Sequence, residues 1–355
     1  MKVATVVGAR PQFIKAAPVS RALREAGHQE LLVHTGQHYD FEMSQVFFEE
    51  LRIPQPDVNL EVGSGPHGWQ TGRMLIGVEE ILRTQQPDLV LVYGDTNSTL
   101  AGALAACKLR IPLAHVEAGL RSHNREMAEE HNRVLTDHVS DLLLCPTHTA
   151  VGNLKREGIT RGVHLVGDVM YDSLLVGLKQ IEGRYALMGR LGIKEKAYAL
   201  ATVHRAENTD NPEKLSSILR GLQEIVRNGL AVVVPLHPRT RQKLASLGLS
   251  LDGLSLTAPF TYVEMLLLEL HARVILTDSG GVQKEAYWLG VPCVTLRQET
   301  EWVETVESGW NVLVGCETSR IARAAETARP GLVLQDAYGD GKAAERLVTL
   351  LVSMG

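Results

Sequence analysis

The chain has 355 residues, of which 45% are hydrophobic, 22% charged and 5% aromatic, and its formal net charge is −5. This length suits about two domains of roughly 150 residues, and the composition is typical of soluble globular proteins. The negative charge argues against a nucleic-acid surface, and the shortage of aromatic side chains argues against a platform that stacks single-stranded bases. No apolar run has the length of a membrane span, and the chain starts with a strand rather than a signal peptide, so we expect a cytoplasmic protein.

The cysteines and histidines give no metal signature. Four cysteines lie far apart along the chain: Cys107, Cys145, Cys293 and Cys316. We expect them to be reduced and mostly buried thiols. His131 and His138 lie two turns apart on one expected helix, but the sequence contains no His-Glu-x-x-His pattern, so we expect no metal site.

Runs of apolar, partly β-branched residues alternate with helical periodicity through the first half of the chain. The strands we expect are residues 3–7, 31–33, 89–93, 112–116, 141–145 and 163–166. Pro11 suits the first position of a helix, and further helices are expected at 98–109 and from Glu129 onward. Alternation of this kind predicts βαβ units and a mainly parallel sheet.

Residues 63–68, Gly-Ser-Gly-Pro-His-Gly, match the glycine pattern of dinucleotide-binding sites. That pattern binds a dinucleotide only when a strand ends immediately before it and a helix opens inside it. The preceding residues, 57–62, are no clear strand, and Pro66 lacks an N–H group. We therefore expect a mobile loop ahead of a helix at 71–82, and no nicotinamide site.

The second half repeats this architecture without repeating the sequence. Its expected strands are residues 198–203, 231–235, 274–277 and 292–296, and its expected helices are 212–228, 263–271 and 283–289. A polar, glycine-containing segment, 181–196, marks the boundary between the halves. We predict an α/β protein with two Rossmann-like domains, 1–170 and 171–340, each built on a mainly parallel sheet.

One stretch of the second half has the form of an anion site. The strand 274–277 is followed by Ser279, Gly280 and Gly281, and helical periodicity then resumes. Unpaired N–H groups at a helix start, together with the helix dipole, favour a bound anion. Glu285, about one turn further, can accept hydrogen bonds from ribose hydroxyls. An ordinary strand-to-helix turn is the alternative interpretation.

Polar residues recur just past the carboxyl ends of the expected strands. They are Arg10, Asp95, Glu117, His204, His237 and Ser279. In open α/β sheets ligands bind at this edge, so we expect these groups to converge on a crevice between the two domains. The alternative is that loops are polar in any case.

Two of these carboxylates differ in how well a structural role explains them. Asp95 could cap the next helix, although Thr96 or Asn97 could do so instead. Glu117 precedes Ala-Gly and has no capping role that we can identify. Glu117 is therefore the stronger catalytic candidate.

The remaining charged candidates have two interpretations each. Glu129 and Glu130 are either first-turn acids that complement the helix dipole, with Arg133 as an (i, i+4) partner, or catalytic groups. Arg10 and Lys15 are either solvated surface charges or cations that strengthen a phosphate site at a helix N-terminus.

Several strings run in a familiar order over nearly the whole chain. They are Val-Gly-Ala-Arg-Pro (7–11) with Lys15, Thr-Gly-Gln-His (35–38), Gly-Asp-Thr (94–96), His-Val-Glu-Ala-Gly-Leu-Arg (115–121), Glu-Glu-His-Asn-Arg (129–133), Val-His-Arg-Ala-Glu-Asn (203–208), Thr-Asp-Ser-Gly-Gly-Val-Gln-Lys-Glu (277–285) and Tyr-Gly-Asp-Gly (338–341). Together they resemble the non-hydrolysing UDP-N-acetylglucosamine 2-epimerases. The resemblance implies a GT-B-like fold, with helix 341–355 completing the N-terminal domain and a UDP-sugar in the central cleft. It also implies a homodimer and reversible inversion at C2 of an N-acetylhexosamine, without a metal, NAD or other cofactor.

The resemblance also implies roles for individual residues. The diphosphate ligands would be Arg10, His204, Ser279, Gly280 and Gly281. Glu285 would bind the ribose, and the uracil would lie against residues 259–265, which end at Met265. The residues around the sugar would be Lys15, Asp95, Glu117, Glu129 and Arg133. The catalytic set would be Asp95, Glu117, Glu129 and His204.

The reaction explains why such a set is needed. The C2 proton is not beside a carbonyl, so the family mechanism expels UDP to form a 2-acetamidoglucal and then adds it back with protonation on the other face. Expulsion requires cations and backbone N–H groups at the diphosphate. Inversion requires acid and base groups on both faces of the sugar, which accounts for several carboxylates.

Some positions depart from the family pattern. The common Thr-Glu-Arg-Pro-Glu is Thr-Glu-Trp-Val-Glu (300–304) here, so Trp302 replaces an arginine, and Tyr39 replaces the arginine of the allosteric form. The altered string is similar to relatives that act on UDP-2,3-diacetamido-2,3-dideoxy-uronic acids, which are the first alternative substrate. A GT-B glycosyltransferase with a UDP-sugar donor is the alternative of another class, and a non-catalytic nucleotide-sugar sensor is the third.

Overall fold

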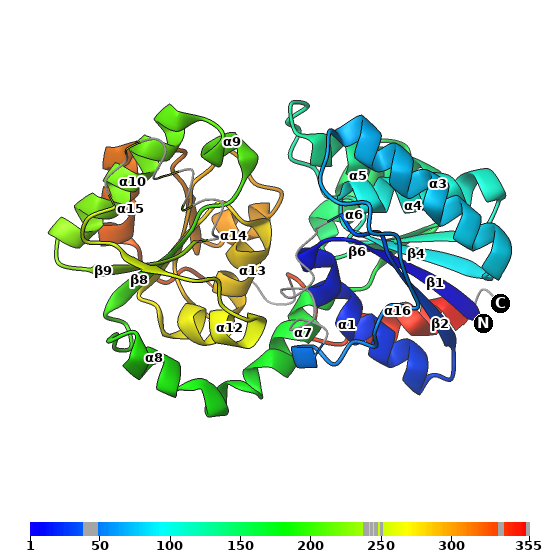
Figure 1. Ribbon diagram of the computed structural model, residues 1–355, viewed down its shortest axis with the longest axis horizontal. Coiled ribbons are helices and arrows are strands. Elements are labelled where there is room, and N and C mark those ends of the chain that lie inside the picture. Colours follow the sequence, from blue (N-terminus) through cyan, green and yellow to red (C-terminus); the bar gives the residue numbers. More distant parts are fainter. Residues whose placement is uncertain are drawn as a thin grey trace. The chain divides into compact units, whose positions relative to one another are not determined.

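The protein forms two α/β units, each with its own parallel sheet (Figure 1). The computed structural model describes residues 1–37, 49–236, 241, 244, 248, 251–332 and 337–352. Unit 1 comprises Met1–Val176 and the C-terminal segment that carries helix α16 (Ala343–Val352). The described part of unit 2 runs from Gly177 to Leu332.

Unit 1 is built on a seven-stranded sheet in which every pair of neighbours is parallel. In spatial order the strands are β3 (Val58–Asn59), β2 (Gln29–His34), β1 (Lys2–Val7), β4 (Leu89–Tyr93), β5 (Leu113–Val116), β6 (Leu142–Cys145) and β7 (Val163–Leu165). All residues of β4, β5 and β6 are buried, which is typical of parallel strands covered by helices on both faces.

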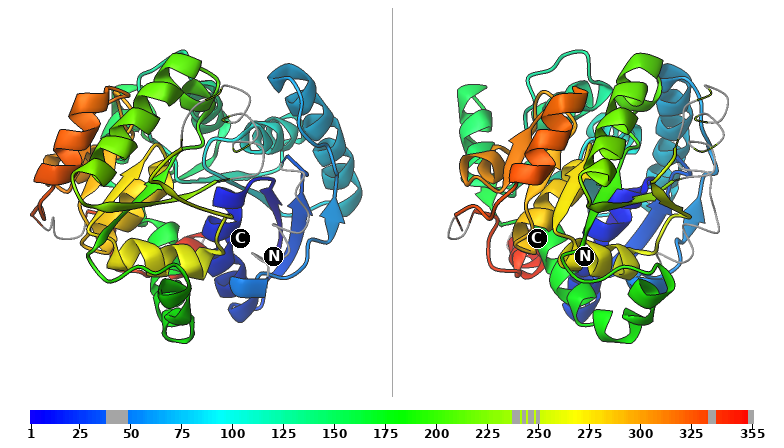
Figure 2. Two further views of the ribbon diagram at one scale, coloured as in Figure 1. Left: turned by 60° about the vertical axis from the view of Figure 1, so that its left-hand side comes forward. Right: turned by 90° about the vertical axis from the view of Figure 1, so that its left-hand side faces the viewer.

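The helices of unit 1 divide between the two faces of its sheet, as Figure 1 shows. They are α1 (Arg10–Glu25), α3 (His67–Gln85), α4 (Asn97–Leu109), α5 (Ala128–Val139), α6 (His148–Arg156), α7 (Val169–Leu178) and α16. Helices α3, α4 and α5 are successive neighbours on one face, and α1 and α16 lie side by side on the other (Figures 1 and 2).

Helix α16 belongs to unit 1 because its apolar face is buried there. Leu347 and Leu351 are fully buried, and α16 packs along α1. The carboxylate of Asp172, on α7, accepts hydrogen bonds from the N–H groups of Ala343 (3.2 Å) and Ala344 (2.8 Å) at the start of α16. The chain leaves unit 1 within α7, after Val176, whereas the sequence placed this boundary at residue 170.

Unit 2 has a six-stranded parallel sheet. In spatial order its strands are β10 (Ser255–Thr257), β9 (Ala231–Pro235), β8 (Tyr198–Thr202), β11 (Val274–Thr277), β12 (Cys293–Thr295) and β13 (Asn311–Leu313). Its helical elements are η1 (Ile181–Arg184), α8 (Ala186–Arg190), α9 (Ala206–Thr209), α10 (Pro212–Arg227), α12 (Tyr262–His271), α13 (Gly280–Trp288), α14 (Val303–Glu307) and α15 (Thr318–Thr327).

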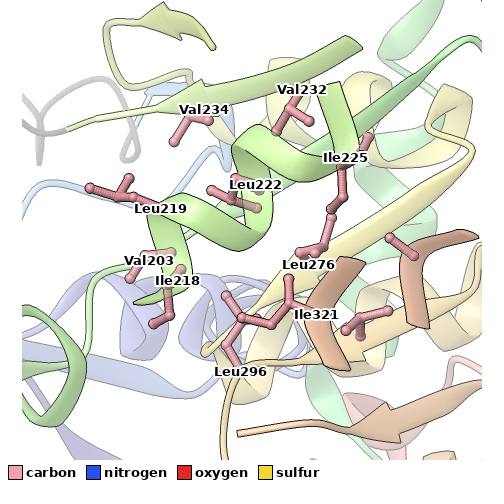
Figure 3. Close-up of a cluster of buried hydrophobic side chains, with 14 of the residues drawn as sticks. Val203, Ile218, Leu219, Leu222, Ile225, Val232, Val234, Leu276, Leu296 and Ile321 are labelled. Atoms are coloured by element: carbon pink, nitrogen blue, oxygen red, sulfur yellow. The ribbon is translucent and has the colours of Figure 1, made fainter. Parts of the chain in front are cut away.

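Helix α10 shows how the sequence pattern builds the core of unit 2. Its apolar residues recur at intervals of three and four and are buried: Leu215, Ile218, Leu219, Leu222 and Ile225. This spacing places them on one face of the helix, which packs against strand residues such as Val232, Val234 and Leu276 (Figure 3).

The predicted fold class, two α/β units with parallel sheets, is confirmed. Three short strands, β3, β10 and β13, were not predicted. Each has two or three residues and forms the edge of a sheet, so it carries too few positions for a periodic pattern. No helix within the described residues is long and apolar enough to span a membrane.

Two local predictions need correction. Helix α3 begins at His67, inside the glycine string 63–68, rather than at residue 71, with Pro66 in the capping position. The preceding strand β3 ends at Asn59, so no strand leads directly into the glycines, as a dinucleotide site requires. Cys107 is exposed rather than buried, because it lies on the outer side of α4, whereas Cys145 and Cys293 are buried.

Candidate active site

The carboxyl edge of the unit 1 sheet brings Asp95 and Glu117 together at the ends of adjacent strands. Strands β4 and β5 pair directly, and each carboxylate follows within two residues of its strand. Glu117 is 6% exposed and has a φ of +72°, in the left-handed region. A non-glycine residue there is strained by about 1–3 kcal/mol, and such strain is concentrated at functional sites.

Lys15 forms a buried ion pair with Glu117. The Lys15 ammonium, on α1, lies against Glu117 Oε2, and both side chains are almost fully buried. Gly94 lies beneath this pair with a φ of +61°, and a Cβ there would be 3.0 Å from Lys15 Nζ and 3.3 Å from Glu117 Oε2. The interpretation of Lys15 as a solvated surface charge is therefore wrong, and only glycine leaves room for the pair.

Asp95 is held by Arg133 and does not cap a helix. Arg133 donates to Asp95 Oδ2 from Nη2 (2.5 Å) and from Nε (3.2 Å), and the Asp95 carbonyl accepts from the Asn132 side chain (2.9 Å). Thr96 caps α4, since its hydroxyl accepts from the N–H of Thr99. The Asp95 carboxylate is therefore oriented by a cation from another helix, α5.

The structure separates the roles of Glu129 and Glu130. The Glu130 carboxylate is buried and accepts from the N–H groups of Ser122 (2.9 Å) and His123 (3.0 Å) and from Arg133 Nη1 (2.7 Å). Within the part of the chain that the structure describes, the half-buried Glu129 makes no side-chain hydrogen bond or ion pair. Glu130 holds the loop after β5, and Glu129 keeps the catalytic interpretation.

A buried polar network that the sequence did not assign lies below these carboxylates. His115 is fully buried, with Nδ1 2.7 Å from Asp137 Oδ1 and Nε2 2.8 Å from the Gly94 carbonyl oxygen. Arg121 donates to Asp137 Oδ2 (2.7 Å) and to both oxygens of Glu157 (2.7 Å each). His115 and Arg121 are the first and last residues of the string that contains Glu117. A single sequence does not show that both contact Asp137 on α5.

In unit 2, Asp278 fixes the loop that carries His204. Its fully buried carboxylate accepts from the N–H groups of His204 (3.2 Å) and Arg205 (3.1 Å) and from Asn208 Nδ2 (3.0 Å), and it pairs with His204 Nδ1 at 3.1 Å. Burial raises the pKa of Asp278, but the charge and hydrogen bonds of His204 and its loop outweigh burial and lower this pKa to about 2. His204 itself remains exposed.

The expected anion loop lies at the first turn of a helix. Ser279 is the N-cap of α13, and the helix begins at Gly280 rather than at residue 283. A Cβ on Gly280 would come within 2.8 Å of Trp302 Nε1, so glycine is required where the indole packs against the loop. The N–H groups of this first turn are therefore presented at the same sheet edge as His204, since β8 and β11 are adjacent.

Trp302, where the family pattern has arginine, is buried and covers a buried cation. Lys284 Nζ lies 3.7 Å from the centroid of the Trp302 ring and 5.6 Å from that of Trp288. This geometry is that of a cation–π interaction. The preceding Glu301 makes two hydrogen bonds with buried Arg297, at 3.0 and 3.1 Å, which anchors the altered string.

Met265 and Glu285 lie on neighbouring helices of unit 2. Met265 is half-buried in the first turn of α12, which Thr261 caps, and Glu285 is buried on α13. His237 and Tyr39 lie outside the described residues. In the described ranges no three His, Cys, Asp or Glu side chains gather as a metal site requires.

Comparison with known proteins identifies the family. The family model described as UDP-N-acetylglucosamine 2-epimerase matches residues 21–352. The chain belongs to this family. As a UDP-N-acetylglucosamine 2-epimerase family member, it is an isomerase, which agrees with the resemblance stated for its strings.

Three relatives show how closely the chain follows this epimerase family. A Methanococcus maripaludis protein described as a UDP-N-acetylglucosamine 2-epimerase homolog is 54% identical, over 99% of each chain. The UDP-2,3-diacetamido-2,3-dideoxy-D-glucuronate 2-epimerase of Pseudomonas aeruginosa is 51% identical, over the whole of both chains. The structure of the Methanocaldococcus jannaschii UDP-GlcNAc 2-epimerase was solved in complex with UDP-GlcNAc and UDP. It matches this chain with a TM-score of 0.92 and 44% sequence identity, over 99% of this chain and 100% of its own. This match supports the GT-B-like fold class.

The epimerase strings therefore correspond to two groups of residues, one in each unit. In unit 1, ion pairs connect Lys15 with Glu117 and Arg133 with Asp95, and Arg10 is half-buried at the start of α1. In unit 2, one carboxylate, Asp278, ties together the segments of His204 and Ser279. The individual roles in binding and catalysis stay predictions.

Proposed function

We propose that the protein interconverts UDP-N-acetylglucosamine and UDP-N-acetylmannosamine by inverting C2. UDP would be eliminated to leave a 2-acetamidoglucal and would then add back after protonation on the opposite face. The observation that carries this proposal is the cluster of oriented carboxylates and cations at the ends of β4 and β5: Lys15, Asp95, Glu117 and Arg133.

Unit 1 has the groups that proton transfer at C2 needs. Glu117 is buried beside a lysine, and Asp95 is oriented by an arginine, so two carboxylates with different partners flank one sheet edge. Each carboxylate therefore has a cation beside it that holds it in place, as a group that transfers a proton in the transition state must be. Glu129 is the third member of the proposed proton-transfer set.

Unit 2 has the groups that stabilise a departing diphosphate. The first-turn N–H groups at Gly280 and Gly281 suit an anion, and His204 is held by Asp278 next to them in the sheet. Preorganised donors of this kind stabilise charge that develops on a leaving group. We assign Glu285 to the ribose and Met265 to the side of the uracil.

Isotope exchange tests the reaction directly. Purified protein is incubated with UDP-N-acetylglucosamine in deuterated water, and C2 is followed by NMR. Deuterium at C2 together with a mannosamine product supports epimerisation. Transfer that requires an added acceptor would instead indicate a glycosyltransferase, and binding of UDP-sugar without exchange would indicate a sensor.

A UDP-2,3-diacetamido-2,3-dideoxy-uronic acid is the second candidate substrate. Trp302 replaces the family arginine, and the P. aeruginosa relative that bears this activity in its name is 51% identical. The same exchange assay with both substrates in parallel decides between them. The true substrate is expected to show the higher kcat/KM.

We also propose, from the family resemblance, that the protein is a cytoplasmic homodimer. Two large apolar side chains, Trp69 and Ile76, are exposed seven residues apart on one face of α3, which fits a covered surface. Sedimentation of the purified protein tests the dimer. A monomer at micromolar concentration would contradict it.

A further inference from the structure

His115 is a buried histidine that has a hydrogen-bond acceptor at each ring nitrogen. Nε2 lies 2.8 Å from the Gly94 carbonyl oxygen, which can only accept, so Nε2 carries a hydrogen. Nδ1 lies 2.7 Å from Asp137 Oδ1. The protonation state of the ring therefore depends on whether the Asp137 carboxyl is ionised.

The surroundings of Asp137 show that it is ionised. Its carboxylate accepts from the N–H of Gly119 (3.1 Å to Oδ2) and from Arg121 Nη1 (2.7 Å), besides facing His115. An ionised Asp137 can only accept, so Nδ1 of His115 carries a hydrogen as well, and the ring is an imidazolium.

This imidazolium connects the two strand ends that bear the carboxylates. His115 is on β5, two residues before Glu117, and its Nε2 holds the carbonyl of Gly94, the residue before Asp95. Gly94 itself lies against the Lys15–Glu117 pair, with its ideal Cβ position 3.0 Å from Lys15 Nζ. A movement of the Gly94 peptide would therefore shift both carboxylates.

We propose that His115 is a positioning residue for the epimerisation: as a buried imidazolium, it holds the Gly94 peptide and thereby the relative placement of Asp95 and Glu117. The inference rests on the proposed function. Among the described residues, titratable or charged groups face this ring or its partners from several elements. They are Asp137 and His138 from α5, Cys145 from β6, Arg121 from the loop after β5, Glu157 after α6, and Lys15 and Glu117 beside Gly94.

A matched pair of variants separates this role from general support of the core. The asparagine amide nitrogen lies where Nδ1 of histidine lies, and that of glutamine reaches the position of Nε2. His115→Asn therefore keeps the bond to Asp137 and loses the bond to Gly94, whereas His115→Gln does the reverse. Glu157→Gln, which disturbs the far side of the same network, is the control.

We expect kcat for C2 exchange to fall on the order of 100-fold in His115→Asn, because small misplacements of catalytic groups have effects of this size. KM and the dissociation constant of UDP should stay within about threefold, since unit 2 binds the nucleotide in the proposal. His115→Gln should keep most of the activity, and Glu157→Gln nearly all of it. Equal losses in the two His115 variants, or a comparable loss in Glu157→Gln, would overturn the proposal.

A second measurement does not depend on folding of variants or on the reaction. Nitrogen-15 NMR of histidine-labelled wild-type protein reports whether each ring nitrogen carries a hydrogen. The proposal requires that His115 carries a hydrogen on both ring nitrogens under the conditions of the exchange assay. A hydrogen on only one ring nitrogen of His115 would refute the inference, whereas failure of exchange in the wild type would refute the proposed function.

Discussion

Glu117 combines features that ordinary core residues lack. It is a buried carboxylate, in a left-handed backbone conformation, beside the ammonium of Lys15. We expect Glu117→Gln and Asp95→Asn each to lower the turnover of C2 exchange by at least about 100-fold, since general acid–base groups contribute this much. The dissociation constant of UDP, measured by calorimetry, should be unchanged. Near-normal turnover in both variants would contradict the assignment.

Glu129 and Glu130 are adjacent but should respond differently to the same substitution. Glu130→Gln places an amide against N–H donors and Arg133, so the free energy of unfolding should fall by about 1–3 kcal/mol. Glu129→Gln removes no hydrogen bond to a described residue and should leave the free energy of unfolding within about 0.5 kcal/mol, while exchange at C2 slows. Urea denaturation and the exchange assay on both variants check this. Loss of turnover without loss of stability in Glu130→Gln would reverse the assignment.

At the scale of elements, Asp278 joins the end of β11 to the loop after β8. Its folded-state pKa of about 2 lies below the ordinary value of 3.8, so its ionised form stabilises the folded protein. This contribution, about 2 kcal/mol, is complete above about pH 4 and is lost as the pH falls towards 2. The stability difference between wild type and Asp278→Asn should therefore shrink as the pH falls from about 4 towards 2. Denaturation series at several pH values in this range measure it, and a difference that grows as the pH falls below 4 would contradict the assignment.

Helix α13 shows what a single element contributes to the site. Its N-cap, Ser279, and its first residue, Gly280, follow a buried strand, and the packing of Trp302 leaves room there only for glycine. The strand–turn–helix form was predictable because a buried apolar run and two glycines encode it locally. The packing of Trp302 was not predictable, because Trp302 lies twenty-two positions further along the chain than Gly280.

At the scale of the whole molecule, the chain returns to unit 1 to add α16. Leu347 on this helix is fully buried in unit 1, where α16 packs along α1. Leu347→Ala should lower the free energy of unfolding by about 2–5 kcal/mol, the usual range for a buried leucine. Urea denaturation followed by circular dichroism measures the change. Leu350→Ala, at a half-buried position one turn further on, is the control and should have a smaller effect.

The sequence by itself determined the succession of strands and helices and the row of polar residues at the strand ends. Parallel strands with crossover helices all present their carboxyl ends at one edge, so position along the chain predicts which residues gather there. The family strings added predicted roles in binding and catalysis for the residues at this edge. The short edge strands and the first turn of α3 were not predicted from the sequence, because they contain too few residues for a periodic signal.

Only the tertiary structure decided which partner each polar group has. Lys15 meets Glu117 across 102 positions of sequence, and Asp278 and His115 hold loops that belong to other strands. Glu129 and Glu130 differ because successive residues of a helix point in directions about 100° apart, and only the surrounding packing shows which direction is the interior. The local sequence pattern encodes the position of a side chain on its helix or strand, whereas long-range packing determines which residues the side chain contacts.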